Sequence, residues 1–168
     1  TLRKVLESVD SEVLQVGGGP HISLAVFYKT ENDENSYLSV IESCLGSLQP
    51  FQVEIDKVDS FPGQENVSFL KVRLSKELKS AHEVVHKELK KRNLTSQEYY
   101  LPGKWTPHIT LTMGNERKKK KTIEFVSNMD IFSKYQIDYL SFIEFRPVKL
   151  IGKYILEAQP VAGGDATR

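Results

Sequence analysis

Two short stretches indicate the fold of this chain: Pro20-His21-Ile22-Ser23-Leu24 and Pro107-His108-Ile109-Thr110-Leu111. The second repeats the first with one change, serine to threonine, 108 − 21 = 87 positions later. On a β-strand, side chains two residues apart point to the same face of the sheet. Each stretch, taken as a strand, therefore places a histidine and a hydroxyl on one face and two aliphatic side chains on the other.

Each stretch also opens the same order of elements, which is strand, helix, strand and returning strand. In the first half we expect these elements at residues 21–28, 37–48, 51–61 and 67–74. In the second half we expect them at residues 107–113, 123–131, 135–145 and 150–156, with the basic run 117–121 leading into the helix. A helix from Ser75 to about Arg92 joins the halves.

The later strands match residue by residue as well. Phe51-Gln52-Val53-Glu54 corresponds to Tyr135-Gln136-Ile137-Asp138, Phe61 to Phe145, and Lys71 to Lys153. We therefore predict an α+β fold of two duplicated β-α-β-β units, a bilobal arrangement in which two antiparallel sheets face a central groove and helices cover the outside.

The expected organisation is a single bilobal domain over residues 20–157, with lobes at about 20–92 and 107–157. Residues 1–19 are expected to form an N-terminal helix and linker, and residues 158–168 a flexible tail.

The paired motifs suit phosphate chemistry. Cleaving a phosphodiester requires a base that removes a proton from the attacking oxygen and an acid that protonates the leaving oxygen. Histidine suits both tasks, because its pKa of about 6.5 lies near neutral pH. If His21 and His108 converge on one groove, Ser23 and Thr110 can donate hydrogen bonds to the phosphate oxygens where charge builds up. The residues alone leave open which histidine is the base.

His21-Ile22-Ser23 and His108-Ile109-Thr110, one triplet in each lobe, resemble the motifs of the 2H phosphoesterase superfamily, which includes 2′-5′ RNA ligases and cyclic nucleotide phosphodiesterases. The resemblance covers nearly all of residues 20–157, and residues 105–111 look especially like the second motif of bacterial and viral members. It implies a bilobal fold, no metal or cofactor, catalysis by His21 and His108, and phosphate binding by Ser23 and Thr110. Ser23 stands where threonine is commoner, and it keeps the hydroxyl.

Several further residues are candidates for substrate contacts. Trp105 could stack on a base at the mouth of the groove, and packing at the core or rim is an equal alternative. Tyr100 and Lys104 lie on the same expected loop, where they could line the entrance or simply be at the surface. Lys153 and Tyr154 are neighbours on the last strand, so alternation sends only one of them toward the groove.

Three features have simpler interpretations. His82 and His86 have the helical spacing of zinc ligands, but no third ligand is evident, so we expect two solvated histidines. Residues 117–121 could guide a polyanion or be a solvated charged surface. The single cysteine, Cys44, lies in an apolar helical face and is expected to pack in the core.

Composition excludes several classes of protein. The chain has 168 residues, 39% hydrophobic and 27% charged, with a net charge of +1, which is typical of a globular domain. One cysteine excludes a disulfide framework and fits a reducing compartment. No apolar run approaches the roughly 20 residues of a membrane span. The start of the sequence is not typical of a signal peptide, so we expect a cytoplasmic protein. We also expect a monomer.

The sequence therefore predicts a hydrolase, a metal-independent phosphodiesterase that acts on 2′,3′-cyclic phosphates or 2′-5′-linked RNA ends and nucleotides. Three alternatives use the same fold: a 2′-5′ oligoadenylate phosphodiesterase of viral or defence type, an RNA ligase running the reverse reaction, and a non-catalytic module that binds RNA or nucleotides.

Overall fold

The structure is a computed structural model that describes residues 19–28, 34–61, 63, 66–145 and 148–158. Its elements follow in the order α3 (Glu34–Leu45), β1 (Phe51–Ser60), β2 (Ser68–Val72), α4 (Lys76–Lys91), the 3-10 helix η1 (Glu98–Tyr100), β3 (His108–Thr112), α5 (Glu116–Ser127), β4 (Lys134–Ile137), β5 (Tyr139–Glu144) and β6 (Lys149–Ile155). The helix predicted at 2–14 and the tail beyond residue 158 lie outside the described residues. None of the described helices is long and apolar enough to cross a membrane.

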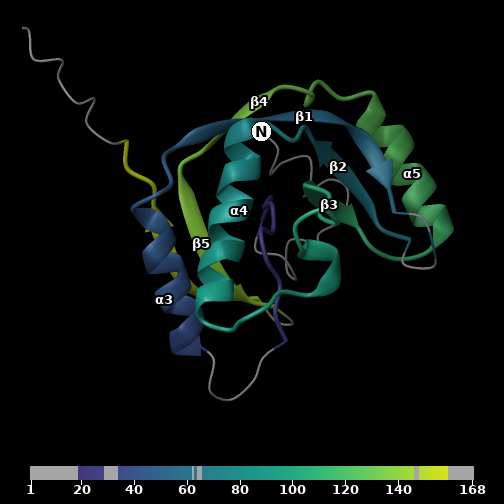
Figure 1. Cartoon of the computed structure of the whole chain (residues 1–168). Helices are drawn as coiled ribbons and strands as arrows, with labels where there is room; N and C mark the ends of the chain where they lie inside the picture. Colours follow the sequence, from purple (N-terminus) through teal and green to yellow (C-terminus); the bar gives the residue numbers. More distant parts are fainter. Residues whose placement is uncertain (1–18, 29–33, 62, 64–65, 146–147, 159–168) are drawn as a thin grey trace, which may run out of the picture.

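The predicted α+β fold with two antiparallel sheets is confirmed. A four-stranded sheet has the order β3-β2-β1-β4, and β5 pairs with β6 in a second sheet. Figure 1 shows α5 on one flank of the larger sheet, while α3 and α4 run side by side at the other end of the molecule. Because the larger sheet takes β1 and β2 from the first half and β3 and β4 from the second, the two halves are interleaved.

Alternation along the strands builds the main core. One face of the larger sheet carries the buried side chains, and α5 and α4 add Val126 and Leu78 to them. The strand residues of this core are Val53, Ile55, Leu70, Val72, Ile109 and Leu111. Burial of such aliphatic side chains stabilises the fold by about 1.5–3 kcal/mol each. The opposite face of β3 is left for polar side chains.

The two halves meet where β1 pairs with β4. In this ladder Phe51 lies opposite Ile137, Gln52 opposite Gln136, and Val53 opposite Tyr135. Exchanging each residue for its equivalent in the repeat returns the same three pairs, so an approximate two-fold axis passes between Gln52 and Gln136. The sequence repeat is therefore reflected in the structure at this seam.

The continuous strand predicted at 135–145 is wrong at Asp138, where the chain changes partners. β4 pairs with β1, and β5, which begins at Tyr139, pairs with β6. β1 changes partners in the same way, from β4 at Glu54 to β2 at Ile55. The carbonyl of Asp138 accepts a hydrogen bond from the Leu156 amide, so the break keeps its backbone partner.

The strand predicted at 21–28 is also wrong. These residues join no ladder, and side chains and the loop after α4 satisfy part of their backbone. The Val26 amide donates to the Ser96 hydroxyl at 2.9 Å, and the Val26 carbonyl accepts from that hydroxyl and from the Gln97 amide. The aliphatic side chains of Ile22 and Leu24 pack against the core as expected. Alternation thus predicted the faces of this segment but not its pairing.

The helices α3 and α4 enclose a second core. Val40 and Cys44 of α3 pack with Ala81 and Leu89 of α4. Cys44 is fully buried, as predicted, and burial raises the pKa of its thiol to about 11. The predicted bounds of α4 are confirmed, because the Ser75 hydroxyl caps the helix by accepting a hydrogen bond from the Leu78 amide at 3.1 Å.

Candidate active site

Strand β3 places the second motif. Ile109 and Leu111 are buried, while His108 and Thr110 are half-buried on the other face. The register sets Lys71 opposite His108 and Phe69 opposite Thr110. The sequence therefore positions the histidine and the hydroxyl of this motif by simple alternation, as predicted.

The imidazole of His108 is held in one orientation. Its Nδ1 donates a hydrogen bond to the Thr106 carbonyl at 2.7 Å, because a carbonyl oxygen can only accept. The ring meets Phe61 edge-on at 5.0 Å and Phe69 at 5.2 Å between centroids. In the neutral ring the Nε2 atom therefore carries the lone pair.

His21 has the same local arrangement although its segment forms no strand. Its Nδ1 donates to the Gly19 carbonyl, also two residues earlier, at 2.8 Å. His21 is exposed, and Ser23 is half-buried. The repeat thus preserves the orientation of both imidazoles even where it does not preserve the secondary structure.

The surroundings of His108 lower its pKa. Burial lowers the pKa of His108, and the nearby positive charge of His21 lowers it further, against the opposing effect of the Thr106 carbonyl. The two imidazoles, 87 positions apart in the sequence, therefore lie within electrostatic reach. Among the described residues, no group of three or more His, Cys, Asp or Glu side chains could hold a metal ion.

The expectation that His82 and His86 are solvated is wrong. His82 is only 3% exposed and stacks on Trp105, with 4.0 Å between ring centroids and 4° between planes. The ring of His86 packs against the ring of His82, with 4.3 Å between centroids. The spacing of Leu78, His82, Val85 and Leu89 was the available signal, since these residues share one helical face.

The other predicted contact residues have varied surroundings. Trp105 also donates its indole N–H to the Ser23 carbonyl at 3.0 Å. The Tyr100 carbonyl accepts from His82, and exposed Lys104 pairs with Glu98. On β6, the Lys153 ammonium lies 4.0 Å from the centroid of the Tyr139 ring. Tyr154 is half-buried, and its ring lies so close to Gly152 that a Cβ there would collide with it.

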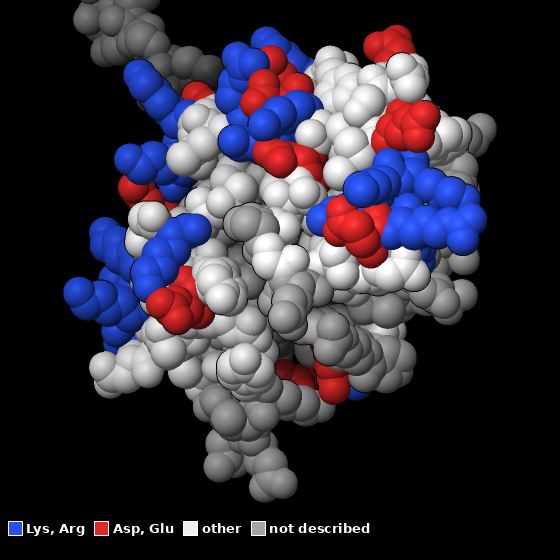
Figure 2. All heavy atoms as spheres, turned by 90° about the vertical axis from the view of Figure 1, so that its right-hand side faces the viewer, with Lys and Arg blue, Asp and Glu red and all other residues white. Residues whose placement is uncertain are grey.

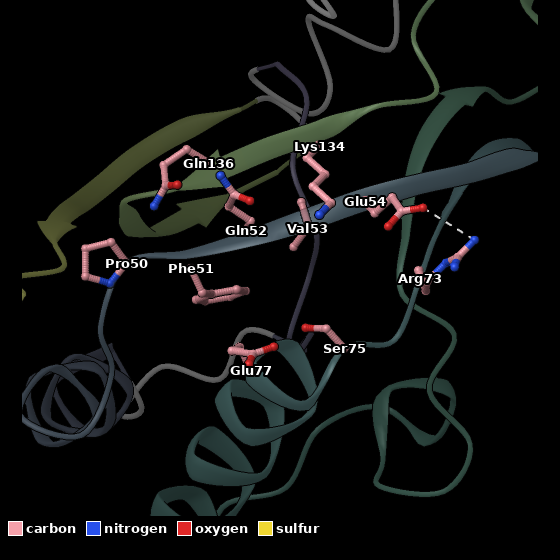
Figure 3. Close-up of a pocket in the computed structure, with 10 residues that line it drawn as sticks. All are labelled: Pro50, Phe51, Gln52, Val53, Glu54, Arg73, Ser75, Glu77, Lys134 and Gln136. Carbon is pink, nitrogen blue, oxygen red and sulfur yellow. Dashed lines mark ion pairs between the residues drawn. The ribbon is translucent and has the colours of Figure 1, made fainter.

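A separate hollow of about 520 Å³ lies over the β1–β4 seam and the start of α4 (Figure 3). Figure 3 shows Arg73 turned toward Glu54, with which it forms an ion pair at 3.4 Å. The lining residues are Pro50, Phe51, Gln52, Val53, Glu54, Arg73, Ser75, Glu77, Lys134 and Gln136. None of the four motif residues is among them, so this hollow is distinct from the histidine site.

Comparison with known proteins decides the family. A family model described as the 2′-5′ RNA ligase superfamily matches residues 10–146, a range that includes both motifs and α4. This chain belongs to the 2′-5′ RNA ligase superfamily. The predicted membership in the 2H phosphoesterase superfamily is thereby confirmed.

The relatives that match this chain include two proteins from Bacillus species. A Bacillus cereus (strain G9842) protein named "Putative phosphoesterase" is 29% identical over 96 residues, which are 56% of this chain and 52% of that protein. A protein of the same name from Bacillus thuringiensis (strain Al Hakam) is 27% identical over 96 residues, with the same coverage. The chain spans about half the length of the curated relatives it matches.

Among solved structures, the crystal structure of TT0787 of Thermus thermophilus shares the fold. The two structures have a TM-score of 0.55 at 16% sequence identity, over 94% of each chain.

In this 2′-5′ RNA ligase superfamily member, His108 contacts Phe61 and Phe69, which the sequence did not predict as its neighbours. The pairing of Phe61 with Phe145 in the repeat was the only sign that its position is constrained.

Proposed function

We propose that this chain is a metal-independent phosphodiesterase that hydrolyses 2′,3′-cyclic phosphates or 2′-5′-linked nucleotides with His21 and His108 as acid and base. The observation that carries the proposal is the matched orientation of the two imidazoles. Each Nδ1 donates to the carbonyl two residues earlier, so each Nε2 is the atom able to exchange a proton with a substrate.

The surroundings of the two rings favour one division of roles. A general base must be neutral, and burial together with the charge of His21 lowers the pKa of His108. His108 is therefore assigned as the base. His21 is exposed and can regain a proton from water after each turnover, so it is assigned as the acid.

With a cyclic phosphate as the substrate, the attacking group is a water molecule. His108 Nε2 removes a proton from this water molecule as the water oxygen bonds to phosphorus. The bond from phosphorus to one ribose oxygen breaks, and His21 donates the Nε2 proton to that oxygen. The hydroxyls of Ser23 and Thr110 donate to the non-bridging oxygens, where negative charge increases in the transition state.

Two findings support this reaction class. The chain belongs to the 2′-5′ RNA ligase superfamily, and a Bacillus relative is named as a putative phosphoesterase. The choice among a 2′,3′-cyclic phosphate, a 2′-5′ oligoadenylate and another nucleotide depends on groups outside the four motif residues. RNA ends or small nucleotides are the proposed substrates, and the protein is proposed to act as a monomer.

A substrate panel tests the proposal. The full chain is incubated with 2′,3′-cyclic nucleotides and with 2′-5′ and 3′-5′ dinucleotides, and the position of the product phosphate is identified. We expect hydrolysis of at least one 2′,3′-cyclic or 2′-5′ substrate. Binding of these nucleotides without turnover of any would instead indicate a non-catalytic binding module.

A further inference from the structure

The segment that carries the first motif is held in an unusual way. Residues 21–28 have no strand partner, so a ladder does not fix the position of His21 and Ser23. Ser96 and Gln97 bind the segment at Val26, and two aromatic side chains hold its backbone closer to the motif. Trp105 donates its indole N–H to the Ser23 carbonyl at 3.0 Å, and His86 donates its Nε2–H to the Leu24 carbonyl at 3.2 Å.

The two donors are joined by a third ring. His82 stacks in parallel on Trp105 at 4.0 Å and packs against His86 at 4.3 Å, tilted by 44°. Its Nε2 donates to the Tyr100 carbonyl at 2.8 Å. We call these three side chains, His86, His82 and Trp105, the ring stack. It connects α4 to the loop that leads into β3.

Both histidines of the ring stack donate from Nε2, because the carbonyls of Tyr100 and Leu24 can only accept. Burial lowers the pKa of His82 and of His86, partly offset by the carbonyls that accept from them. Two other titratable groups of α4 act on the pKa of His82: His86 lowers it and Glu83 raises it. A neutral imidazole that donates from Nε2 has no proton on Nδ1, so the ring stack uses the tautomer opposite to that of the two motif histidines.

We propose that the ring stack is a positioning device that fixes the first motif against the second, and thereby sets the placement of His21 relative to His108. Trp105 precedes His108 by three residues and binds the carbonyl of Ser23, which follows His21 by two. One side chain therefore ties both motifs together, and His82 and His86 brace it against α4. A misplacement of about 1 Å can cost a reaction ~10²-fold, so such a brace has a direct effect on turnover.

Two tests are available: a kinetic test, which rests on the proposed function, and an exchange test, which does not need turnover. In the kinetic test, kcat and KM are measured for two variants. Trp105→Phe keeps a ring but loses the N–H that binds the Ser23 carbonyl, and His86→Leu loses the N–H that binds the Leu24 carbonyl. His86→Gln keeps a side-chain N–H, and Lys87→Ala, on the exposed side of α4, is the matched control. In the exchange test, amide hydrogen exchange of residues 21–26 is followed in the same proteins, with circular dichroism as the check of folding.

We expect kcat to fall about 10- to 100-fold in Trp105→Phe and His86→Leu with KM within about twofold. Exchange of residues 21–26 is expected to be about tenfold faster in both variants, because each has lost one hydrogen bond to the segment. His86→Gln is expected to stay within about threefold of the parent in both measurements. Lys87→Ala is expected to match the parent.

Four results would overturn the inference: unchanged exchange of residues 21–26, faster exchange with unchanged kcat, equal damage in His86→Gln and His86→Leu, or a raised KM with unchanged kcat in Trp105→Phe. The last result would make Trp105 a substrate platform. If the parent turns over none of the panel substrates, the proposed function fails, and the exchange measurement alone decides whether the ring stack holds the segment.

Discussion

Replacing each motif histidine by asparagine separates proton transfer from local structure. An asparagine side chain can donate to the carbonyl two residues earlier, as Nδ1 of His21 and His108 does, but it has no group at the position of Nε2. A positioned acid or base contributes ~10² to 10⁴-fold. His21→Asn and His108→Asn should therefore each lose that much in kcat, which corresponds to about 2.7–5.5 kcal/mol.

The structural cost of the same changes is small and differs between the two sites. His21 is exposed, so the stability of His21→Asn should equal that of the parent. His108 contacts Phe61 and Phe69, and its replacement should cost about 1 kcal/mol of unfolding free energy. The double variant should lose less activity than the product of the two single losses, because the residues act as a unit.

The assay is hydrolysis of the best substrate of the panel across about pH 4–10, with thermal unfolding followed in parallel. The parent should show a bell-shaped pH dependence, since the base must be neutral and the acid protonated. Because the pKa of His108 is lowered, the acidic limb should lie below the ordinary histidine value of about 6.5. In His108→Asn that limb should disappear. A folded His21→Asn protein with full activity would refute the paired-histidine mechanism, and a persistent acidic limb in His108→Asn would refute the assignment of the base.

Three further expectations concern the same site and its surroundings. Activity should survive EDTA, because in the proposed mechanism the motif side chains supply acid, base and hydrogen-bond donors. Loss of activity in EDTA and its recovery with zinc or manganese would contradict this. Ser23→Ala and Thr110→Ala should each lower kcat by about 10¹ to 10³-fold, as losses of one transition-state donor, and unchanged kcat in both would remove these hydroxyls from the mechanism. Replacing Arg117–Lys121 by glutamine should weaken binding of long RNA and flatten its salt dependence without changing mononucleotide turnover, and equal salt slopes would show that the run does not contact RNA.

The basic run illustrates what sequence could and could not predict. It was expected to precede a helix, whereas α5 begins at Glu116 and contains the run, with Lys119 paired to Glu116 at 2.7 Å. Figure 2 shows Lys and Arg side chains gathered in several patches on this side of the molecule, with acidic side chains among them. Local charge was evident from the sequence, but its arrangement on the surface depends on the fold.

The periodicity of the sequence predicted the features that depend on residues close together in the chain. The alternation in β3 and the cap at Ser75 were foreseeable, because they depend on neighbours in the sequence. The pairing of residues 21–28 and the break at Asp138 were not, because they depend on which distant backbone lies alongside. The prediction of a solvated His82 was wrong, because the Trp105 ring and the Tyr100 carbonyl, which are distant in the sequence, give it a buried place.

The seam between β1 and β4 has a consequence for how the molecule holds together. Its register is self-complementary, which is the geometry of an isologous interface between two identical subunits. Here both sides of that interface belong to one polypeptide, and α4 and the following loop are the tether. Two separate subunits would meet at a rate set by their concentration, but tethered strands have a fixed effective concentration. The pairing across Gln52 and Gln136, and with it the approach of the two motifs, is therefore independent of how dilute the protein is.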